Sequence, residues 1–342
     1  MKRRIVLLAE RIDLKSHKTT DVLLRYLADE IVGIVDPYNR GKNLGEILGA
    51  EYNIPIASGL DELLEFKPNY LLVGFIPAGG LLKTDWYPIV IRALQSKMNV
   101  ISGLHQNLRE EAEFSLLSKK YKTKLIHLRE QKGTYLRPRT KKSRNFTSIL
   151  ALDTALSGWD IVTSMELFRN FKKKSFPVNW VATSILGNLI KKQDYVAESF
   201  SADQLSTFIS DKVYNAGRDA AYVFVEGYAS LTDFVTKGVA VSILTGAQPD
   251  GIILCHSIDT TVFSEISAKI NKQREILDTL LADDQAAPVL GISLNTRILE
   301  DNEAKDTLSL LQSEFEVPVV DPARFGASAL IQQITALKPR QL

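Results

Sequence analysis

The sequence predicts an α/β protein built from two successive doubly wound domains. Short apolar runs of strand length, rich in Val, Ile and Leu, alternate along the chain with stretches of helical periodicity. Continuous apolar strands joined by crossover helices are typical of a parallel sheet that is covered on both faces. A charged segment containing Gly and Pro, residues 129–146, interrupts this alternation, and a length of 342 residues suits two domains.

The elements of the first domain are expected within residues 1–130. Strands are predicted at 4–9, 31–36, 70–75, 99–104 and 124–128, and helical segments at 21–27, 43–52, 86–97 and 110–121. A basic linker is expected at 131–146, and the second domain at 147–342. Its strands are predicted at 147–153, 178–184, 221–227, 251–257, 288–295 and 317–321, with helices after Gly158, after Ser201 and around 269–281.

Composition restricts the classes of function. The chain is 45% apolar and 24% charged with a net charge of +2, which is typical of a globular protein and too small to favour nucleic acid as a partner. The N-terminal apolar run is interrupted by Glu10 and Arg11, so a buried strand is a better interpretation than a secretion signal. No uncharged stretch approaches the roughly 18 residues of a membrane-spanning helix. With Cys255 as the only cysteine, a cytoplasmic protein is expected.

The first domain offers two candidate anion or nucleotide contacts near its N-terminus. The turn after the first strand lacks the glycine fingerprint of a dinucleotide fold, so a standard NAD site is not expected. Asp36 lies where such folds place a ribose-binding acid, although an Asp that caps the turn before Pro37 is the alternative. Lys18 and Thr19 begin a predicted helix, where an anion is favoured, with plain N-capping as the alternative.

Two further candidate contacts follow strands of the first domain. Gly79 and Gly80 in "GFIPAGG" would let the backbone approach a ligand closely. Ser102 and His105 in "VISGLHQ" follow the next strand, and open α/β sheets bind ligands at the carboxyl ends of their strands. A turn without function is the alternative interpretation in each case.

The second domain begins with a strand, a turn of small residues and a helix in "LALDTALSGWDIVTSMELF", the layout of a phosphate-binding loop. Such a loop needs a lysine for the phosphate oxygens and a Ser or Thr hydroxyl for magnesium. With Gly158 as the last loop glycine, Trp159 takes the lysine position and Asp160 the hydroxyl position. Shifted by one residue, Ser157 takes the glycine position and Gly158 the lysine position. Neither register supplies the lysine, so ATP with magnesium is not expected as a cofactor.

Other polar residues follow strands of the second domain. Glu226 ends the strand of "AYVFVEG", the position from which a phosphate-loop enzyme reaches magnesium or its water, or else it is an acid at an exposed strand end. Asn295 ends the strand of "GISLN". Cys255 and His256 are neighbours on one strand, so their side chains point to opposite faces and they are interpreted as structural. No cluster has convincing metal-ligand spacing, so no metal is predicted.

Taken together, these segments resemble a bacterial and archaeal family known as domain of unknown function 1611, with a Rossmann-like domain followed by a P-loop NTPase-like domain. The resemblance runs through "IVDPYNRGKNLGEILG", "GFIPAGG", "VISGLH", "GISLNTR" and "VPVVDPARFG", and is most specific from Val225 to His256. Typical members carry a loop similar to Gly-Thr-Asp-Cys-Ala-x-Gly-Lys, like that of dethiobiotin synthetase. Aligning Asp153 with the aspartate of that family loop selects the shifted register, in which Gly158 takes the position of the lysine.

The resemblance implies N-acyl transfer, because some members are described as D-glutamate N-acyltransferases. By position it implies that Glu226 matches the strand-end glutamate and Asn295 a nucleotide-base contact. For acyl transfer, Glu226 or His105 would be the general base. The backbone N–H groups of the loop from Thr154 to Gly158 would hold a phosphate of acetyl-CoA or the developing oxyanion.

The sequence thus predicts a site for a small anionic metabolite, expected in a cleft between the domains. A kinase or ligase like dethiobiotin synthetase and a non-catalytic ligand-binding or assembly protein are the alternatives. A homo-oligomer is also expected. Trp86 and Tyr87 would anchor its interface, or else they begin a helix that covers the first sheet.

Overall fold

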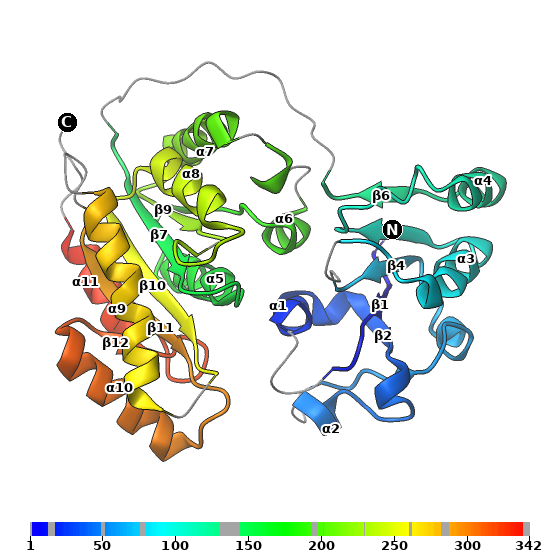
Figure 1. Cartoon of the computed structure of the whole chain (residues 1–342), viewed down its shortest axis with the longest axis horizontal. Helices are drawn as coiled ribbons and strands as arrows, with labels where there is room; N and C mark the ends of the chain where they lie inside the picture. Colours follow the sequence, from blue (N-terminus) through cyan, green and yellow to red (C-terminus); the bar gives the residue numbers. More distant parts are fainter. Residues whose placement is uncertain are drawn as a thin grey trace. The chain divides into compact units, whose positions relative to one another are not determined.

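A computed structural model gives the fold of the chain (Figure 1). It describes residues 2–12, 18–48, 52–75, 80–129, 144–192, 197–200, 202–228, 230–259, 262–281 and 287–337. For residues 18–21, 198, 202 and 203 it describes the backbone alone. Two compact units are present: Met1–Lys132 with Asn188–Val196, and Gly133–Gly187 with Ala197–Leu342.

The first unit contains a six-stranded sheet in the order β3-β2-β1-β4-β5-β6, with every neighbouring pair parallel. Its strands are β1 (Ile5–Leu8), β2 (Ile31–Val35), β3 (Ile56–Ala57), β4 (Tyr70–Val73), β5 (Asn99–Ser102) and β6 (Leu125–His127). Its α-helices are α1 (Lys18–Leu27), α2 (Gly45–Leu48), α3 (Tyr87–Gln95) and α4 (Ala112–Tyr121). Strand order reverses beside β1, which is the usual place for a ligand in a doubly wound sheet.

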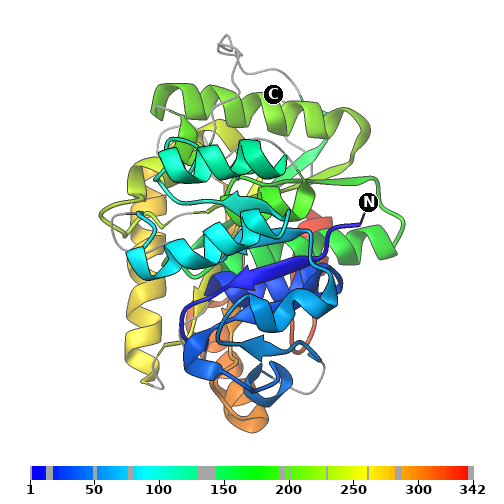
Figure 2. The same cartoon turned by 90° about the vertical axis from the view of Figure 1, so that its right-hand side faces the viewer.

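Helices α3 and α4 lie side by side on one face of this sheet (Figure 2). Trp86 is only 7% exposed and belongs to the hydrophobic core, with its ring centroid 5.7 Å from that of Phe75. The ring of the half-buried Tyr87 lies 4.9 Å from that of Phe114. The aromatic cluster therefore packs the helices onto the sheet, which was the other interpretation of these two residues.

The second unit contains another six-stranded parallel sheet, in the order β12-β11-β10-β7-β9-β8. Its strands are β7 (Thr147–Asp153), β8 (Val178–Val181), β9 (Tyr222–Glu226), β10 (Gly251–Ser257), β11 (Val289–Asn295) and β12 (Val319–Val320). Its α-helices are α5 (Trp159–Lys173), α7 (Ala202–Ala216), α8 (Lys237–Ala247), α9 (Phe263–Leu280), α10 (Asp301–Phe315) and α11 (Ser328–Ala336). Helix α6 (Ile185–Lys191) begins in this unit and ends in the stretch that is grouped with the first.

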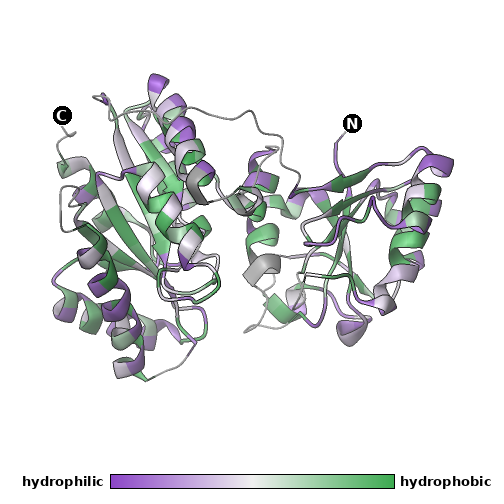
Figure 3. Ribbon diagram, turned by 45° about the horizontal axis from the view of Figure 1, so that its top comes forward, coloured by the Kyte–Doolittle hydropathy of each residue, from purple (hydrophilic) through white to green (hydrophobic). Residues whose placement is uncertain are grey.

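Strand β7 lies in the middle of the second sheet, and every one of its residues is buried. The central strands are predominantly apolar along their length (Figure 3), because helices cover both faces of the sheet. The predicted fold class, two doubly wound α/β domains, is confirmed. Helix α9 begins at Phe263, ahead of the predicted start at 269. Within the described residues, no helix is long and apolar enough to cross a membrane.

Candidate functional site

The candidate phosphate loop lies between β7 and α5, at the carboxyl edge of the second sheet. The strand ends at Asp153, and the helix begins at Trp159 with Gly158 as its N-terminal cap. Gly158 has a φ of 72°, a left-handed conformation that glycine adopts without steric cost. The backbone therefore has the strand, turn and helix of a phosphate loop, as the sequence indicated.

Three backbone N–H groups of the loop and the helix start, those of Ala155, Ser157 and Trp159, are bound by the chain's own side chains. The carboxylate of Asp153 accepts hydrogen bonds from the backbone N–H of Ser157 at 2.9 Å and of Ala155 at 3.3 Å, and from the Ser157 hydroxyl. Ser157 Oγ in turn accepts from the N–H of Trp159 at 3.1 Å. In a working phosphate loop such N–H groups point at the phosphate oxygens. Here Asp153 supplies the anion that the loop binds.

Trp159, the first residue of α5, is a core residue. It is 3% exposed, and its indole Nε1 donates to Ser293 Oγ at 2.9 Å. Thr163 Oγ1 lies 2.7 Å from the same serine oxygen and also donates to the Trp159 carbonyl. If the start of the helix marks the lysine position, a buried indole occupies it. In the other register Gly158 occupies it, and a lysine there would be strained by the left-handed backbone.

Three buried carboxyl groups surround the loop. Asp153, Asp160 and Glu226 are each at most 1% exposed. Burial raises the pKa of Asp160 well above its ordinary value, and the negative charges of Asp153 and Glu226 raise it further, although a hydrogen bond from the N–H of Tyr228 opposes them. Asp160 is therefore favoured in its neutral form. Even so, the described residues contain no group of three or more acids, histidines or cysteines placed to hold a metal ion.

Glu226 is held at the end of β9 by the segment that follows β8. Its Oε2 accepts from the N–H of Thr183 at 2.8 Å, and its backbone carbonyl accepts from the Thr183 hydroxyl at 3.0 Å. A Cβ atom on Gly187 would lie 2.1 Å from Glu226 Oε2, so glycine is required there for this close approach. The predicted base thus lies beside the acid of the loop, and it is completely buried.

We expect ATP with magnesium to bind weakly or not at all, because the N–H groups of Ala155 and Ser157 are already bonded to Asp153 and the nearby acids would repel a triphosphate. Isothermal titration calorimetry of the whole chain tests this, with magnesium chloride alone as the control titration. A dissociation constant of about 10 µM or tighter, within the range of functional sites, would contradict the expectation.

The structure pairs Thr154 with His256, a contact that the sequence did not reveal. Thr154 Oγ1 lies 2.6 Å from His256 Nδ1. Cys255, the preceding residue on β10, is completely buried, and burial together with the charge of Asp153 raises the pKa of its thiol. Asp153 is paired with Cys255 in the parallel register of β7 and β10, so Thr154 and His256 are brought together just beyond that pair. Strand order, which decides this register, is not readable from single segments.

Asn295 ends β11 and is half-buried. Its Nδ2 donates to Ser257 Oγ at 3.3 Å and its Oδ1 accepts from the N–H of Arg297 at 3.2 Å. Both polar atoms of the Asn295 side chain therefore stabilise the turn after β11. The contact of Asn295 with a nucleotide base stays a prediction.

In the first unit, Gly80 and His105 lie against each other. A Cβ atom on Gly80 would be 2.1 Å from His105 Cδ2, and the φ of Gly80 is 68°. The Gly80 carbonyl also accepts from the N–H of Gln106 at 3.1 Å. His105 is exposed at this turn, whereas Ser102 is buried. Gly79 and most of the basic linker lie outside the described residues, as do the side chains of Lys18 and Thr19.

Asp36 follows β2 and organises the turn around it. One of its oxygens accepts from the N–H of Arg11 and of Tyr38, and the other from the N–H of Ile12 and from Asn39 Nδ2. All four separations lie between 2.7 and 3.1 Å. The carboxylate is completely buried, so these bonds correspond to the capping alternative.

Comparison with known proteins identifies the family. Residues 37–131 match the Rossmann-like domain of DUF1611, and residues 140–331 match its P-loop domain. The chain belongs to the DUF1611 family. A family member from Anabaena variabilis, known from a crystal structure, is 24% identical, with a TM-score of 0.88 over 98% of this chain and 99% of that one. That likeness shows the fold.

Two curated relatives are named D-glutamate N-acetyltransferase. The one from a Pseudoalteromonas species is 28% identical over 80% of this chain and 83% of its own length. The one from Tritonibacter scottomollicae is 25% identical over 97% of this chain and 98% of its own length. The similarity therefore extends through both domains.

Proposed function

We propose that this DUF1611 protein transfers a small acyl group, with acetyl-CoA as the candidate donor, to the amino group of an acidic amino acid such as D-glutamate. The observation that carries the proposal is the match to a relative named for this activity over 97% of the chain. The proposal includes a cytoplasmic homo-oligomer, whose mass in solution can be measured by light scattering.

The buried acids suit the proton transfer that this reaction requires. An amino acid carries an ammonium group near neutral pH, and this group must lose a proton before its nitrogen can attack an acyl carbon. A carboxyl group whose pKa is raised is a stronger general base once it is ionised. Burial and neighbouring charges raise the pKa of Asp160 in this way, and Glu226 lies beside it. His105 remains the candidate base of the first unit.

The donor's phosphates need a place other than the loop N–H groups as they stand. The N–H groups of Ala155, Ser157 and Trp159 already donate to the side chains of Asp153 and Ser157. We therefore propose that the loop contributes to the reacting centre and that cationic side chains elsewhere hold the phosphates. Their identity is open to mutagenesis, and the basic linker from Lys132 to Arg144 is the first segment to test.

The experiment is an assay of the purified chain with acetyl-CoA and D-glutamate, L-glutamate or D-aspartate, with the N-acetylated product detected by mass spectrometry. We expect product with D-glutamate. Glu226→Gln keeps an acceptor for the Thr183 N–H but removes the carboxylate, and should lower kcat by about 100-fold or more. Glu275→Gln, in the exposed part of α9, is the matched control and should leave kcat unchanged.

A binding protein without catalysis is the second candidate, and the complete burial of Glu226 favours it. In that case no acidic amino acid would be acetylated, while D-glutamate or acetyl-CoA would still raise the melting temperature by binding the native state.

A further inference from the structure

A threonine hydroxyl and an imidazole meet at the carboxyl ends of β7 and β10, in the middle of the second sheet. The distance of 2.6 Å between Thr154 Oγ1 and His256 Nδ1 is within reach of a nucleophile and its general base. Thr154 is the first residue after the central strand, where doubly wound sheets hold their ligands. The pair lies outside the carboxylate cluster of the loop.

The backbone of Thr154 is fixed on both sides. Its N–H donates to the Cys255 carbonyl at 2.9 Å, and its carbonyl accepts from Ser230 Oγ at 2.9 Å and from Thr232 Oγ1 at 3.2 Å. Gln273 of α9, which is completely buried, donates to the Asp153 carbonyl at 2.9 Å and accepts from Ser230. These partners hold the main chain around Thr154. The Thr154 hydroxyl therefore does not have to stabilise the loop, and it lies against the imidazole.

Threonine hydroxyls within the helices are used differently. Those of Thr279 and Thr307 donate to the backbone carbonyl four residues earlier in their helices, at 2.9 and 2.8 Å. Such a bond satisfies a hydroxyl but gives no route for its proton. Thr154 instead has the imidazole of His256 as its partner, and when His256 Nδ1 is unprotonated the hydroxyl donates to it. An oxygen nucleophile requires this arrangement.

The burial pattern also suits a reactive group. Ser230 and Gln273 have no exposed surface and His256 is 2% exposed, whereas Thr154 keeps 7% of its surface exposed. Of these four residues, Thr154 is the most exposed. Exclusion of bulk water around it would protect an ester from hydrolysis.

We propose that Thr154 is a covalent acyl carrier and that His256 is its general base. This inference rests on the proposed acyl transfer and adds an acyl-enzyme intermediate to it. Thr154 Oγ1 attacks the carbonyl carbon of an acyl thioester while His256 Nδ1 takes the hydroxyl proton. The carbon–sulfur bond breaks, and the departing thiolate takes that proton. The acceptor amine then attacks the ester carbon and loses its proton to His256, and the carbon–oxygen bond breaks as that proton returns to Thr154.

The test is rapid acid quenching of the whole chain mixed with acetyl-CoA in the absence of an amine, followed by peptide mass spectrometry. We expect one acetyl group on the peptide that contains Thr154. Thr154→Val, which has nearly the same shape without the hydroxyl, should carry none. His256→Gln should slow its formation by about 100-fold or more. Thr279→Val, on the outer face of α9, should be labelled like the unchanged protein.

Melting temperatures and circular dichroism establish that each variant is folded. If His256→Gln fails to fold, the pH dependence of acetylation is measured on the unchanged protein instead. The acetylation rate should rise as the imidazole loses its proton. Acetylated amino acid formed by Thr154→Val at the unchanged rate, or product without an acetylated peptide at any quench time, would overturn the inference and leave the proposed function intact. An acetylated Thr154 with no amino acid accepting the group would support the inference and overturn the proposed acceptor.

Discussion

Replacing Trp159 with alanine should lower the free energy of unfolding of the second unit by about 3–5 kcal/mol, the usual cost of removing a buried aromatic side chain. The indole is 3% exposed at the start of α5, and its Nε1 donates to Ser293. Truncation leaves a cavity between the helix and the sheet. Ser293 keeps Thr163 as a partner, so the loss comes mainly from packing. Chemical denaturation followed by circular dichroism measures the change.

Two variants serve as controls for this substitution. Trp159→Phe retains most of the buried ring and loses the Nε1 hydrogen bond, so it should cost about 1–2 kcal/mol. Leu156→Ala changes a loop side chain that is 44% exposed and should cost less than about 1 kcal/mol. If Trp159→Ala cost no more than Leu156→Ala, the interpretation of the helix start as part of the core would be wrong.

Replacing Asp160 with asparagine should stabilise the protein at neutral and alkaline pH. Burial, and then the charges of Asp153 and Glu226, hold the pKa of Asp160 well above its value in an unfolded chain. The folded state therefore binds this proton more tightly. Its contribution to stability is present at low pH and is lost as the pH rises through the folded-state pKa. Asparagine is neutral at every pH and keeps an oxygen that can accept from the Tyr228 N–H.

The measurement is the melting temperature of both proteins between about pH 4 and pH 9, where the advantage of Asp160→Asn should grow with pH. Each unit of difference between the folded and unfolded pKa is worth about 1.4 kcal/mol, so we expect a gain of about 1 kcal/mol or more. Asp278→Asn, on the exposed side of α9, is the matched control and should show no such trend. A constant difference would mean that Asp160 ionises normally, and one that shrinks as pH rises would mean that folding lowers its pKa.

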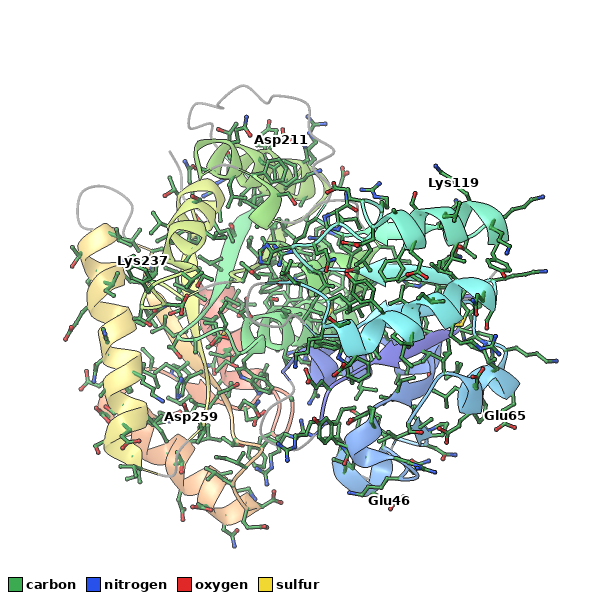
Figure 4. All side chains as sticks on the ribbon, turned by 45° about the vertical axis from the view of Figure 1, so that its right-hand side comes forward. Glu46, Glu65, Lys119, Asp211, Lys237 and Asp259 are labelled. Atoms are coloured by element: carbon green, nitrogen blue, oxygen red, sulfur yellow. The ribbon has the colours of Figure 1, made fainter. Side chains whose placement is uncertain are left out.

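Ordinary charged residues of the surface are labelled in Figure 4. Lys119 on α4 and Glu65 before β4 are exposed and project outward from the ribbon. Charges of that kind are solvated and carry little information about function. Asp153, Asp160 and Glu226 are buried at strand ends and at a helix start, where an unsatisfied charge would be costly.

The sequence by itself determined the two doubly wound domains, because apolar runs of strand length between helical patterns leave few alternatives to covered parallel sheets. It also determined the missing lysine of the loop, since both registers lack one. Local patterns suffice for such features because they depend on residues that are neighbours along the chain.

Only the tertiary structure decided how the loop is used. That Asp153 accepts from Ser157 is a contact within the loop itself. That Trp159 bonds to Ser293 and that Thr154 meets His256 depend on which strands pair and in which register. Residues on β10 and β11 are about 100 or more positions away from the loop in the chain, and their contacts with it arise from strand order. The physical reason is that a parallel sheet brings the carboxyl ends of distant strands to one edge, where side chains interact through space rather than along the sequence.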